Sequence, residues 1–387
     1  MMLDTSTRRN LELTETLREK QKRGTLLWVL DKTKTAMGAR MLRTLVEQPL
    51  ISREEILRRQ NAIEELNMNY ISREELCEYL NPIYDLERLI GRISYRTANP
   101  RDLIAFGNSL AMLPYIKQIL KEFSGELLKN LEAALDPLAD LKELIDKAIV
   151  EEPPITVREG GIIKEGYHEE ADRLRHAKTE GKDWLAQLEQ SEREKTGIKN
   201  LKIRFNKVFG YYLEVTKSNL EDVPENYIRK QTLANCERFI TPELNDLAEL
   251  ILGSEEKIVD LEYQLFTEIR NAVAAEVERI QLCAHIISVI DALQSLAEVA
   301  EKQNYTKPVV DEGDIIDIKE GRHPVVEKAM AGQFISNDTY LDSGDTRLAI
   351  ITGPNMAGKS TYMRQTALIV LMAQTVSYTH LTLPTIA

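Results

Sequence analysis

Apolar residues recur at helical spacing through most of the first 150 residues. The pattern predicts a helix over Thr35–Glu47, which ends before Pro49, and another helix that begins at Asn99–Pro100. The charged, proline-containing stretch Glu151–Pro154 interrupts the pattern. We therefore expect residues 1–150 to form the first part of a helical domain.

The period of the pattern changes from that of a helix to that of a strand near residue 198. His168–Thr196 is rich in charge and has few apolar positions, so it predicts a helix that lies largely in solvent. From Leu201 onward apolar and polar residues alternate, and Gly210 interrupts them as the turn of a hairpin would. We expect a small β structure at about 197–240.

A second helical pattern runs from Pro242 to Asn304, with apolar residues at intervals of three, four and seven. Such spacing is typical of a coiled-coil-like arm, and about sixty residues would span roughly 90 Å as one helix. The β structure would then be carried between two long helices, one leading to it and one returning from it.

Near the C-terminal end a strand pattern is followed by a glycine-rich loop and a helix pattern. Leu348–Ile351 is a short apolar run of the kind that forms a buried parallel strand. Gly353 begins the pattern G-x-x-x-x-G-K-S, which Gly358, Lys359 and Ser360 complete. Strand, glycine loop and helix occur in the order that a P-loop requires.

The residue types in this loop suit the binding of a nucleotide. Glycines allow backbone N–H groups to point at phosphate oxygens, and the start of the following helix adds a partial positive charge. In this pattern Lys359 would reach the β- and γ-phosphates and Ser360 would hold Mg²⁺. We predict a nucleotide site here.

Charge is unevenly distributed along the chain. The 387 residues carry a formal net charge of −12, which on its own argues against nucleic-acid binding. Between Arg193 and Arg238, however, ten Lys and Arg residues stand against six Asp and Glu residues, and tyrosines lie among them. The predicted β structure is therefore locally basic.

Cysteine spacing and hydropathy bear on the compartment. The three cysteines are far apart and form no C-x-x-C pair, which favours free thiols in a reducing environment. No run of about 18 or more apolar residues occurs, and the first residues lack the apolar core of a signal peptide. We expect a cytoplasmic location and no membrane span.

Several motifs together resemble the MutS family of DNA mismatch-repair ATPases, in its clamp-containing bacterial branch. The glycine loop with its T-G-P-N-M preface is the most specific of them, and the similarity covers residues 1 to about 374. The stretches that carry the resemblance are Leu3–Leu13, Asp31–Thr35, Gly210–Val215, Arg229–Leu233, Gly321–Pro324 and Thr352–Thr361.

The resemblance implies a mainly α fold with a small β clamp. It implies a helical core or lever domain with long coiled-coil-like arms, and the N-terminal part of an α/β P-loop ATPase domain of the ABC type. The expected bounds are 1–150 for the first part of the core, 151–262 for the clamp with its stems, 263–305 for the returning lever helix and 306–376 for the ATPase part.

The resemblance also implies roles for individual residues. ATP and Mg²⁺ would bind at the glycine loop, where Ser360 would hold the metal ion and Lys359 would stabilise phosphate. Phe334 and Ile335 stand where the family packs adenine against an aromatic ring. The loop residues are Gly353, Pro354, Asn355, Met356, Ala357, Gly358, Lys359, Ser360 and Thr361.

The clamp would hold the backbone of double-stranded DNA without reading its bases. Its candidate contacts are Asn206, Lys207, Arg229, Lys230, Asn235 and Arg238. In the intact protein the family implies recognition of mismatched DNA, a homodimer and a downstream partner of the MutL type.

The chain also departs from the family pattern, and we expect it to be an internal fragment. The mismatch-reading and connector domains that precede the core in the family have no counterpart here. No apolar strand ending in Asp-Glu follows the glycine-loop helix, so the resemblance implies little or no ATP hydrolysis by this chain alone. Residues 377–387 are uncharged and Thr-rich, and we expect a non-native tail there.

Two other functions fit the same patterns. One is a coiled-coil interaction protein of the SMC-like kind, in which the arm is structural and the tip dimerises. The other is a MutS paralogue that acts on recombination intermediates. A basic tip that binds duplex DNA favours the clamp over the SMC-like hinge.

Overall fold

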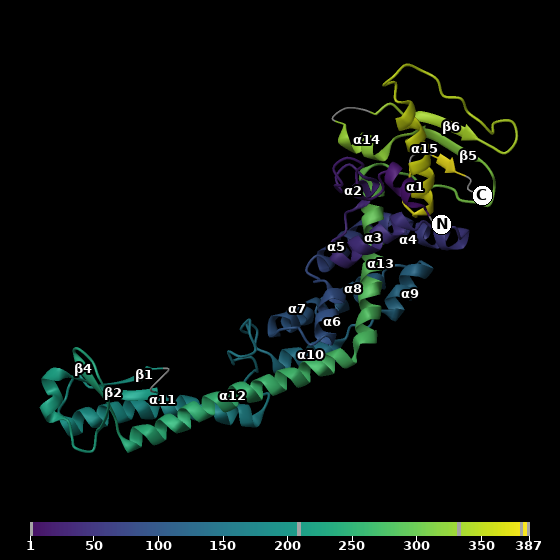
Figure 1. Cartoon of the computed structure of the whole chain (residues 1–387). Coiled ribbons are helices and arrows are strands. Elements are labelled where there is room, and N and C mark those ends of the chain that lie inside the picture. The colour runs from purple at the N-terminus through teal and green to yellow at the C-terminus, as the bar shows by residue number, and fades with distance from the viewer. Residues whose placement is uncertain (1–2, 207–209, 331–333, 380–381, 385–387) are drawn as a thin grey trace. The chain divides into compact units, whose positions relative to one another are not determined.

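The structure is a computed structural model that describes residues 3–206, 210–330, 334–379 and 382–384 (Figure 1). It contains two compact units. Unit 1 comprises residues 1–97, 105–142 and 273–387, and unit 2 comprises residues 98–104 and 143–272. Most of the described residues are helical, and their strands lie in two small antiparallel sheets.

Unit 1 is built around α13 (Val277–Lys302), which is buried along most of its length. Figure 1 shows this green helix among the helices of the first 134 residues. The helices packed against it are α2 (Leu26–Leu30), α3 (Ala36–Glu47), α4 (Arg53–Met68), α5 (Tyr70–Leu80), α6 (Leu86–Ser94) and α9 (Glu126–Ala134). Unit 1 also holds α1 (Thr5–Asn10) and α8 (Leu113–Leu120), while α7 (Pro100–Leu110) and α10 (Ala139–Ala148) contribute to both units.

Two helical stretches have the length and hydropathy of a membrane span, Pro100–Leu120 and Val277–Lys302. Protein buries 78% of the apolar window in the second stretch. This burial is the behaviour of a core helix, which agrees with the place of α13 at the centre of unit 1.

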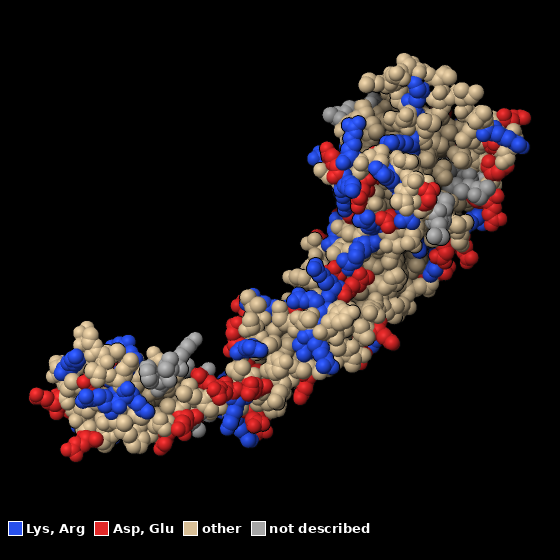
Figure 2. Space-filling model, in the orientation of Figure 1, with Lys and Arg blue, Asp and Glu red and all other residues tan. Residues whose placement is uncertain are grey.

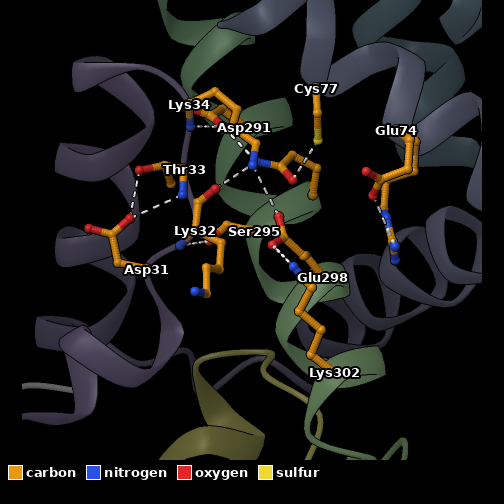
Figure 3. Close-up of polar contacts among 12 residues, drawn as sticks. Asp31, Lys32, Thr33, Lys34, Glu74, Cys77, Asp291, Ser295, Glu298 and Lys302 are labelled. Atoms are coloured by element: carbon orange, nitrogen blue, oxygen red, sulfur yellow. Dashed lines mark hydrogen bonds and ion pairs between the residues drawn. The ribbon is translucent and has the colours of Figure 1, made fainter.

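A buried carboxylate on α13 holds the segment that leads into α3 (Figure 3). Asp291 is fully buried and accepts hydrogen bonds from the backbone amides of Lys34 (2.9 Å) and Thr35 (2.7 Å). It also accepts bonds from the Thr35 hydroxyl (2.7 Å) and the Gln294 amide group (2.8 Å). Burial raises the pKa of Asp291, and these hydrogen bonds oppose the shift without cancelling it.

The neighbouring turn of α13 holds the same segment through a hydroxyl group. Ser295 accepts a hydrogen bond from the Lys32 amide (2.7 Å) and donates one to the Leu30 carbonyl (2.8 Å). Gly38, on the first turns of α3, lies so close to the Asp291 carboxylate that a Cβ atom there would be 2.1 Å from its Oδ2. The absence of a side chain at Gly38 is therefore what lets α3 approach α13.

The C-terminal part of unit 1 carries the second sheet, whose order is β6–β5–β7. Its strands are β5 (Ile316–Gly321), β6 (Asn337–Leu341) and β7 (Thr382–Pro384). Two helices accompany it, α14 (Pro324–Ala329) and α15 (Lys359–Gln374). The glycine loop precedes α15 directly, as the sequence predicts.

Unit 2 contains a four-stranded antiparallel sheet and two long helices, α11 (Glu169–Thr196) and α12 (Pro242–Ala275). The strands are β1 (Lys202–Asn206), β2 (Gly210–Thr216), β3 (Ile228–Thr232) and β4 (Cys236–Ile240), in the order β1–β2–β4–β3. A short 3₁₀ helix, Lys217–Asp222, follows β2. Gly197 ends α11 with φ +74°, a left-handed conformation that favours glycine, and the predicted β1–β2 hairpin is present.

The prediction of one uninterrupted helix from Pro242 to Asn304 is wrong. α12 ends at Ala275 and α13 begins at Val277, with Glu276 between them at φ −96° and ψ 22°. The Glu276 amide bonds to the carbonyl of Val273, three residues back, instead of four. The break is a local tightening of the last turn of α12, which needs neither glycine nor proline. No residue in the sequence therefore marks it.

The contact between Gly38 and Asp291 predicts a specific stability pattern. Gly38→Ala should lower the free energy of unfolding by about 2–3 kcal/mol, since the added methyl group overlaps the buried carboxylate. Gly91→Ala is the matched control, because a Cβ at that helical position meets nothing within 4 Å. Urea unfolding followed by circular dichroism measures both.

Combining Gly38→Ala with Asp291→Ala separates steric overlap from helix propensity. Asp291→Ala alone also destabilises, because it leaves the half-buried amide of Lys34 and the buried amide of Thr35 unpaired. It removes the Oδ2 and Cγ atoms that would lie nearest the added methyl group and leaves the Asp291 Cβ at 2.7 Å, so it relieves most of the overlap. The double variant should lose less stability than the sum of the single variants. Additive losses, or a Gly38→Ala protein as stable as Gly91→Ala, would show that this contact is not tight.

Candidate functional site

The glycine loop forms a sharp turn at the start of α15. Gly353 has φ +151° and Gly358 has φ +82°, and Gly358 is the residue that caps the helix. Met356 at the turn also has a positive φ of 65° and is fully exposed. No side chain within the described residues caps α15, so amides of its first turn remain available to an anion.

The side chain of Lys359 lies across this loop. Its ammonium group donates hydrogen bonds to the carbonyls of Gly353 and Pro354, the latter at 2.8 Å. Ser360 is exposed beside it. One ammonium group, the start of a 16-residue helix and an exposed hydroxyl therefore meet at the loop, a set of groups that suits phosphate oxygens.

The buried parallel strand predicted at Leu348–Ile351 is absent. The segment is extended without strand pairing, and Leu348 and Ile350 are 80% and 82% exposed. A parallel strand becomes buried only when neighbouring strands and helices cover it. Among the described residues none of the three strands of this sheet pairs with the segment, so its apolar side chains face outward.

The segment predicted to pack adenine lies just before β6. Phe334 is half-buried and Ile335 is 84% exposed, so both offer apolar surface. The preceding residues 331–333 lie outside the described part of the chain. β6 in turn contacts α15 through the hydroxyl of Tyr362, which is 2.7 Å from the Thr339 hydroxyl.

A cavity of about 240 Å³ lies beside the glycine loop, next to Ser360 and Thr361. Glu12 from the N-terminal segment lines it; its carboxylate accepts a hydrogen bond from the Leu17 amide (2.8 Å) and lies 3.4 Å from Arg364 of α15. Sequence patterns did not indicate Glu12 or Arg364, because the two residues are 352 positions apart.

In unit 2 one face of the four-stranded sheet packs on the two long helices. Leu213, Val215 and Phe239 point into this core, which includes Leu185 of α11 and Leu244 of α12. The core is small, and polar contacts between the sheet connections and α11 add to it.

One such contact joins Tyr227 to α11. The Tyr227 hydroxyl donates to the Glu192 carboxylate (2.6 Å), which also accepts from Lys195 (2.9 Å), and the Tyr227 ring lies 5.9 Å from that of Phe239. Burial raises the pKa of Glu192, but the bonds from Tyr227 and Lys195 outweigh it, so the pKa is lowered overall.

The opposite face of the sheet is polar. Arg238 lies 4.4 Å from the centre of the Tyr212 ring and donates to Gln231 (2.7 Å), and Arg204 pairs with Glu214 (3.1 Å). Figure 2 shows several Lys and Arg side chains on the visible surface at the left of the view, where Figure 1 labels the strands β1, β2 and β4. The cross-strand pairing puts these side chains together on one face.

The predicted DNA contacts do not share a single face. Arg238 lies on the polar face, whereas Arg229 pairs with the nearly buried Glu237 (2.8 Å) and lies over Phe239, on the helix side. Lys230 is exposed at a bulge in β3, and Asn235 is exposed in the turn before β4. Asn206 ends β1, and Lys207 lies outside the described residues.

Three exposed cations near this sheet were missed by the sequence reasoning, Lys202 and Arg204 on β1 and Lys217 after β2. The alternation of charge in β1 was visible in the sequence. The assignment of each position to a face needed the register between β1 and β2.

Two protein-family models match this chain. The family model for MutS domain III matches residues 6–297, and that for MutS domain V matches residues 349–386. The second match reaches into residues 377–387, and the assignment of this segment as a non-native tail stays a prediction.

Curated relatives are similar over nearly the whole chain. Proteins described as DNA mismatch repair protein MutS from Lachnoclostridium phytofermentans and Ruminiclostridium cellulolyticum are 64% and 58% identical over 98% of this chain. The alignments cover 41% and 43% of those proteins, so the chain spans about two fifths of the relatives' length.

The Tyr227–Glu192 bond predicts a pH-dependent contribution to stability. Tyr227→Phe should cost about 1–2 kcal/mol at pH 7, because it removes a bond to a partly buried carboxylate. Since the pKa of Glu192 is lowered in the folded state, this cost should be present above the ordinary pKa of a glutamate and should shrink as the pH falls through the lowered pKa. Tyr263→Phe, whose ring is 47% exposed on α12, is the control.

Urea unfolding at pH 7 and at successively lower pH values measures the effect of both variants. A Tyr227→Phe cost that does not shrink at any pH down to acid unfolding would show that the carboxylate does not take part.

Proposed function

The chain belongs to the MutS family, and we propose that it is part of a DNA mismatch repair protein and supplies two of its working parts. One is a clamp, formed by the four-stranded sheet with α11 and α12, that holds duplex DNA by its backbone. The other is the phosphate-binding loop of an ATPase domain. The observation that carries the proposal is the presence in one chain of a basic sheet on long helices and a glycine loop with Lys359 across it.

The clamp proposal rests on charge and exposure. The region from Arg193 to Arg238 holds four more cationic than acidic residues in a chain of net charge −12. Lys202, Lys217 and Lys230 are exposed, and all three have the flexible ammonium group that suits contact with phosphate. Because phosphate contacts do not depend on the base, this surface would bind duplexes of any sequence.

The nucleotide proposal rests on the fit between the loop and a triphosphate. Lys359 would exchange its two backbone carbonyl partners for phosphate oxygens, which carry full negative charge. The uncapped first turn of α15 would donate amide N–H groups to the same phosphates. Phe334 and Ile335 would pack against the adenine ring.

Mg²⁺ fits the site through one hydroxyl. Ser360 is exposed at the loop and would contribute an oxygen ligand, beside oxygens of the nucleotide. When bound, the metal ion would neutralise phosphate charge. Lys359 and the first-turn amides would bind and orient the phosphates whether or not the metal is present.

The remaining parts of the family pattern are proposals for the whole protein. We assign residues 1–150 and 263–305 to the core and lever domain, 151–262 to the clamp with its stems, and 306–376 to the ATPase domain. The whole protein would act in the cytoplasm as a homodimer on mismatched duplex DNA and would recruit a partner of the MutL type. The shared description of the curated relatives, DNA mismatch repair protein MutS, supports the action on mismatched DNA.

Salt-dependent DNA binding tests the clamp. The chain should bind duplex DNA with an affinity that falls linearly with salt concentration on logarithmic axes. Lys230→Glu should weaken binding about threefold to tenfold near 100 mM salt and lower the slope by about one. Lys257→Glu, an equal charge change at an exposed position of α12, is the control.

Fluorescence anisotropy with a labelled duplex measures both variants. Equal losses of DNA affinity in Lys230→Glu and Lys257→Glu would mean that binding depends on the net charge of the chain and not on the position of the lysine. Salt-independent dimerisation through the sheet without DNA affinity would contradict the clamp and favour an SMC-like hinge.

Nucleotide binding tests the loop. Lys359→Ala should weaken ATP binding by at least about tenfold, because it removes a charge-assisted contact to phosphate. Lys319→Ala on β5 is the control, since this lysine is exposed and pairs with Asp317 (3.2 Å). Titration with a fluorescent ATP analogue measures the change, and unaltered affinity in Lys359→Ala would contradict the proposed site.

A further inference from the structure

One hydroxyl group joins β6 to the glycine-loop helix α15. Tyr362, in the first turn of α15, donates a hydrogen bond to the carbonyl of Asp338 at 3.0 Å, and its oxygen lies 2.7 Å from the Thr339 hydroxyl. A phenol has a single proton to donate. With that proton on the Asp338 carbonyl, the Thr339 hydroxyl must donate to Tyr362, so two residues of β6 are bound at once.

The surroundings of this contact keep β6 in one position on α15. Thr339 is only 7% exposed, and its hydroxyl also lies 3.4 Å from that of Thr366, one turn further along α15. At the start of β6, a Cβ atom on Gly321 would lie 2.9 Å from the Gln365 amide nitrogen and 3.0 Å from the Asn337 carbonyl. The end of β5, the start of β6 and α15 therefore meet without spare room.

The two halves of the proposed nucleotide site are carried by different elements. Phe334 and Ile335 stand just before β6, whereas Lys359 and Ser360 begin α15. Thr339 and Tyr362, which join the two elements, are 23 positions apart in the chain. A ligand that contacts both halves binds well only if their separation is fixed beforehand. Among the described hydrogen bonds, those of Tyr362 and Thr366 to β6 are the side-chain bonds that join the two elements.

We propose that Tyr362 is a positioning residue that holds the adenine-packing segment at the correct distance from the phosphate loop. This inference rests on the proposed nucleotide function and adds to it a determinant of base recognition. The Tyr362 hydroxyl is engaged with the strand, so it acts on the nucleotide through Phe334 and Ile335 and does not touch phosphate itself. Its loss should affect ligands with an adenine base and spare those without one.

Comparing ATP with inorganic tripolyphosphate tests this role. Both compounds are titrated in competition with a fluorescent ATP analogue bound to the 387-residue chain. Tyr362→Phe should weaken ATP binding about threefold to tenfold, the effect of losing one partly buried and one exposed hydrogen bond, and leave tripolyphosphate binding unchanged. Thr339→Val should reproduce the effect from the strand side, and the double variant should lose little more than either single variant.

Tyr340→Phe is the matched control, because it removes a hydroxyl from the neighbouring residue of β6. Tyr340 is 44% exposed, and its hydroxyl is bonded to Asp342, away from α15. It should bind both compounds as the unaltered chain does. Thermal unfolding of each variant establishes that the comparison is made between folded proteins.

The outcomes separate this inference from the function on which it rests. If Tyr362→Phe keeps the full preference for ATP, or weakens both compounds equally, the positioning role is overturned while the phosphate loop stands. If the unaltered chain binds neither compound, the proposed nucleotide function fails, and the inference fails with it. Loss of the adenine preference alone, in both Tyr362→Phe and Thr339→Val, supports the inference.

Discussion

The burial of Asp291 at the centre of α13 is the constraint on which unit 1 depends. An unpaired buried carboxylate would cost several kcal/mol, so the chain must bring donors to it. The amides of Lys34 and Thr35 and the Thr35 hydroxyl meet that demand, and Gly38 leaves the space for them. Apolar packing alone would allow α3 to slide along α13, whereas these bonds permit a single register.

The N-terminal segment that Asp291 and Ser295 hold also supports the glycine-loop region. Lys328 of α14 donates to the carbonyl of Trp28 (2.8 Å) and lies 4.2 Å from the centre of the Trp28 ring; burial and the nearby charge of Lys32 lower the pKa of Lys328 to about 8. Glu12, whose carbonyl accepts a hydrogen bond from the amide of Leu26 (3.2 Å), contacts Arg364 of α15. The elements that carry the proposed nucleotide site thus contact the part of the chain that precedes the segment held by Asp291 and Ser295.

Unit 2 uses the same physical device. Glu262 of α12 is 1% exposed, accepts hydrogen bonds from the amides of Gly161 and Ile162, and pairs with Arg175 of α11 at 3.0 Å. One buried carboxylate thereby joins a loop and two long helices. The sheet at the far end of these helices needs such support, because its own core is small.

Local patterns in the sequence predicted the elements whose formation depends on neighbouring residues. The helix Ala36–Glu47, the charged helix that ends at Gly197 and the hairpin around Gly210 are confirmed. The prediction of a buried strand at Leu348–Ile351 is wrong, because a parallel strand is buried only when neighbouring strands and helices cover it. The break between α12 and α13 at Glu276 could not be predicted, because no glycine or proline marks it in the sequence. Asp291 was not indicated, since a single acidic residue in an apolar helix shows its role only when distant amides are seen to bind it.

The same limit applies to the candidate sites. The residues of the glycine loop are contiguous, so the loop could be recognised from the sequence. The roles of Tyr362, Glu12 and Arg364 could not, because these residues act through contacts with residues distant in the sequence. For the clamp, local charge indicated the region, but the register of the strands was needed to separate Arg229 from Arg238.

Hydrogen exchange of the 387-residue chain, measured with ATP, with duplex DNA and with neither, tests the central claim that two separate sites lie on this chain. The account predicts that ATP protects amides of residues 353–361 and 334–339, and that DNA protects amides between residues 202 and 240 in a salt-dependent manner. Protection that is absent from both regions, or that appears only elsewhere, would contradict it.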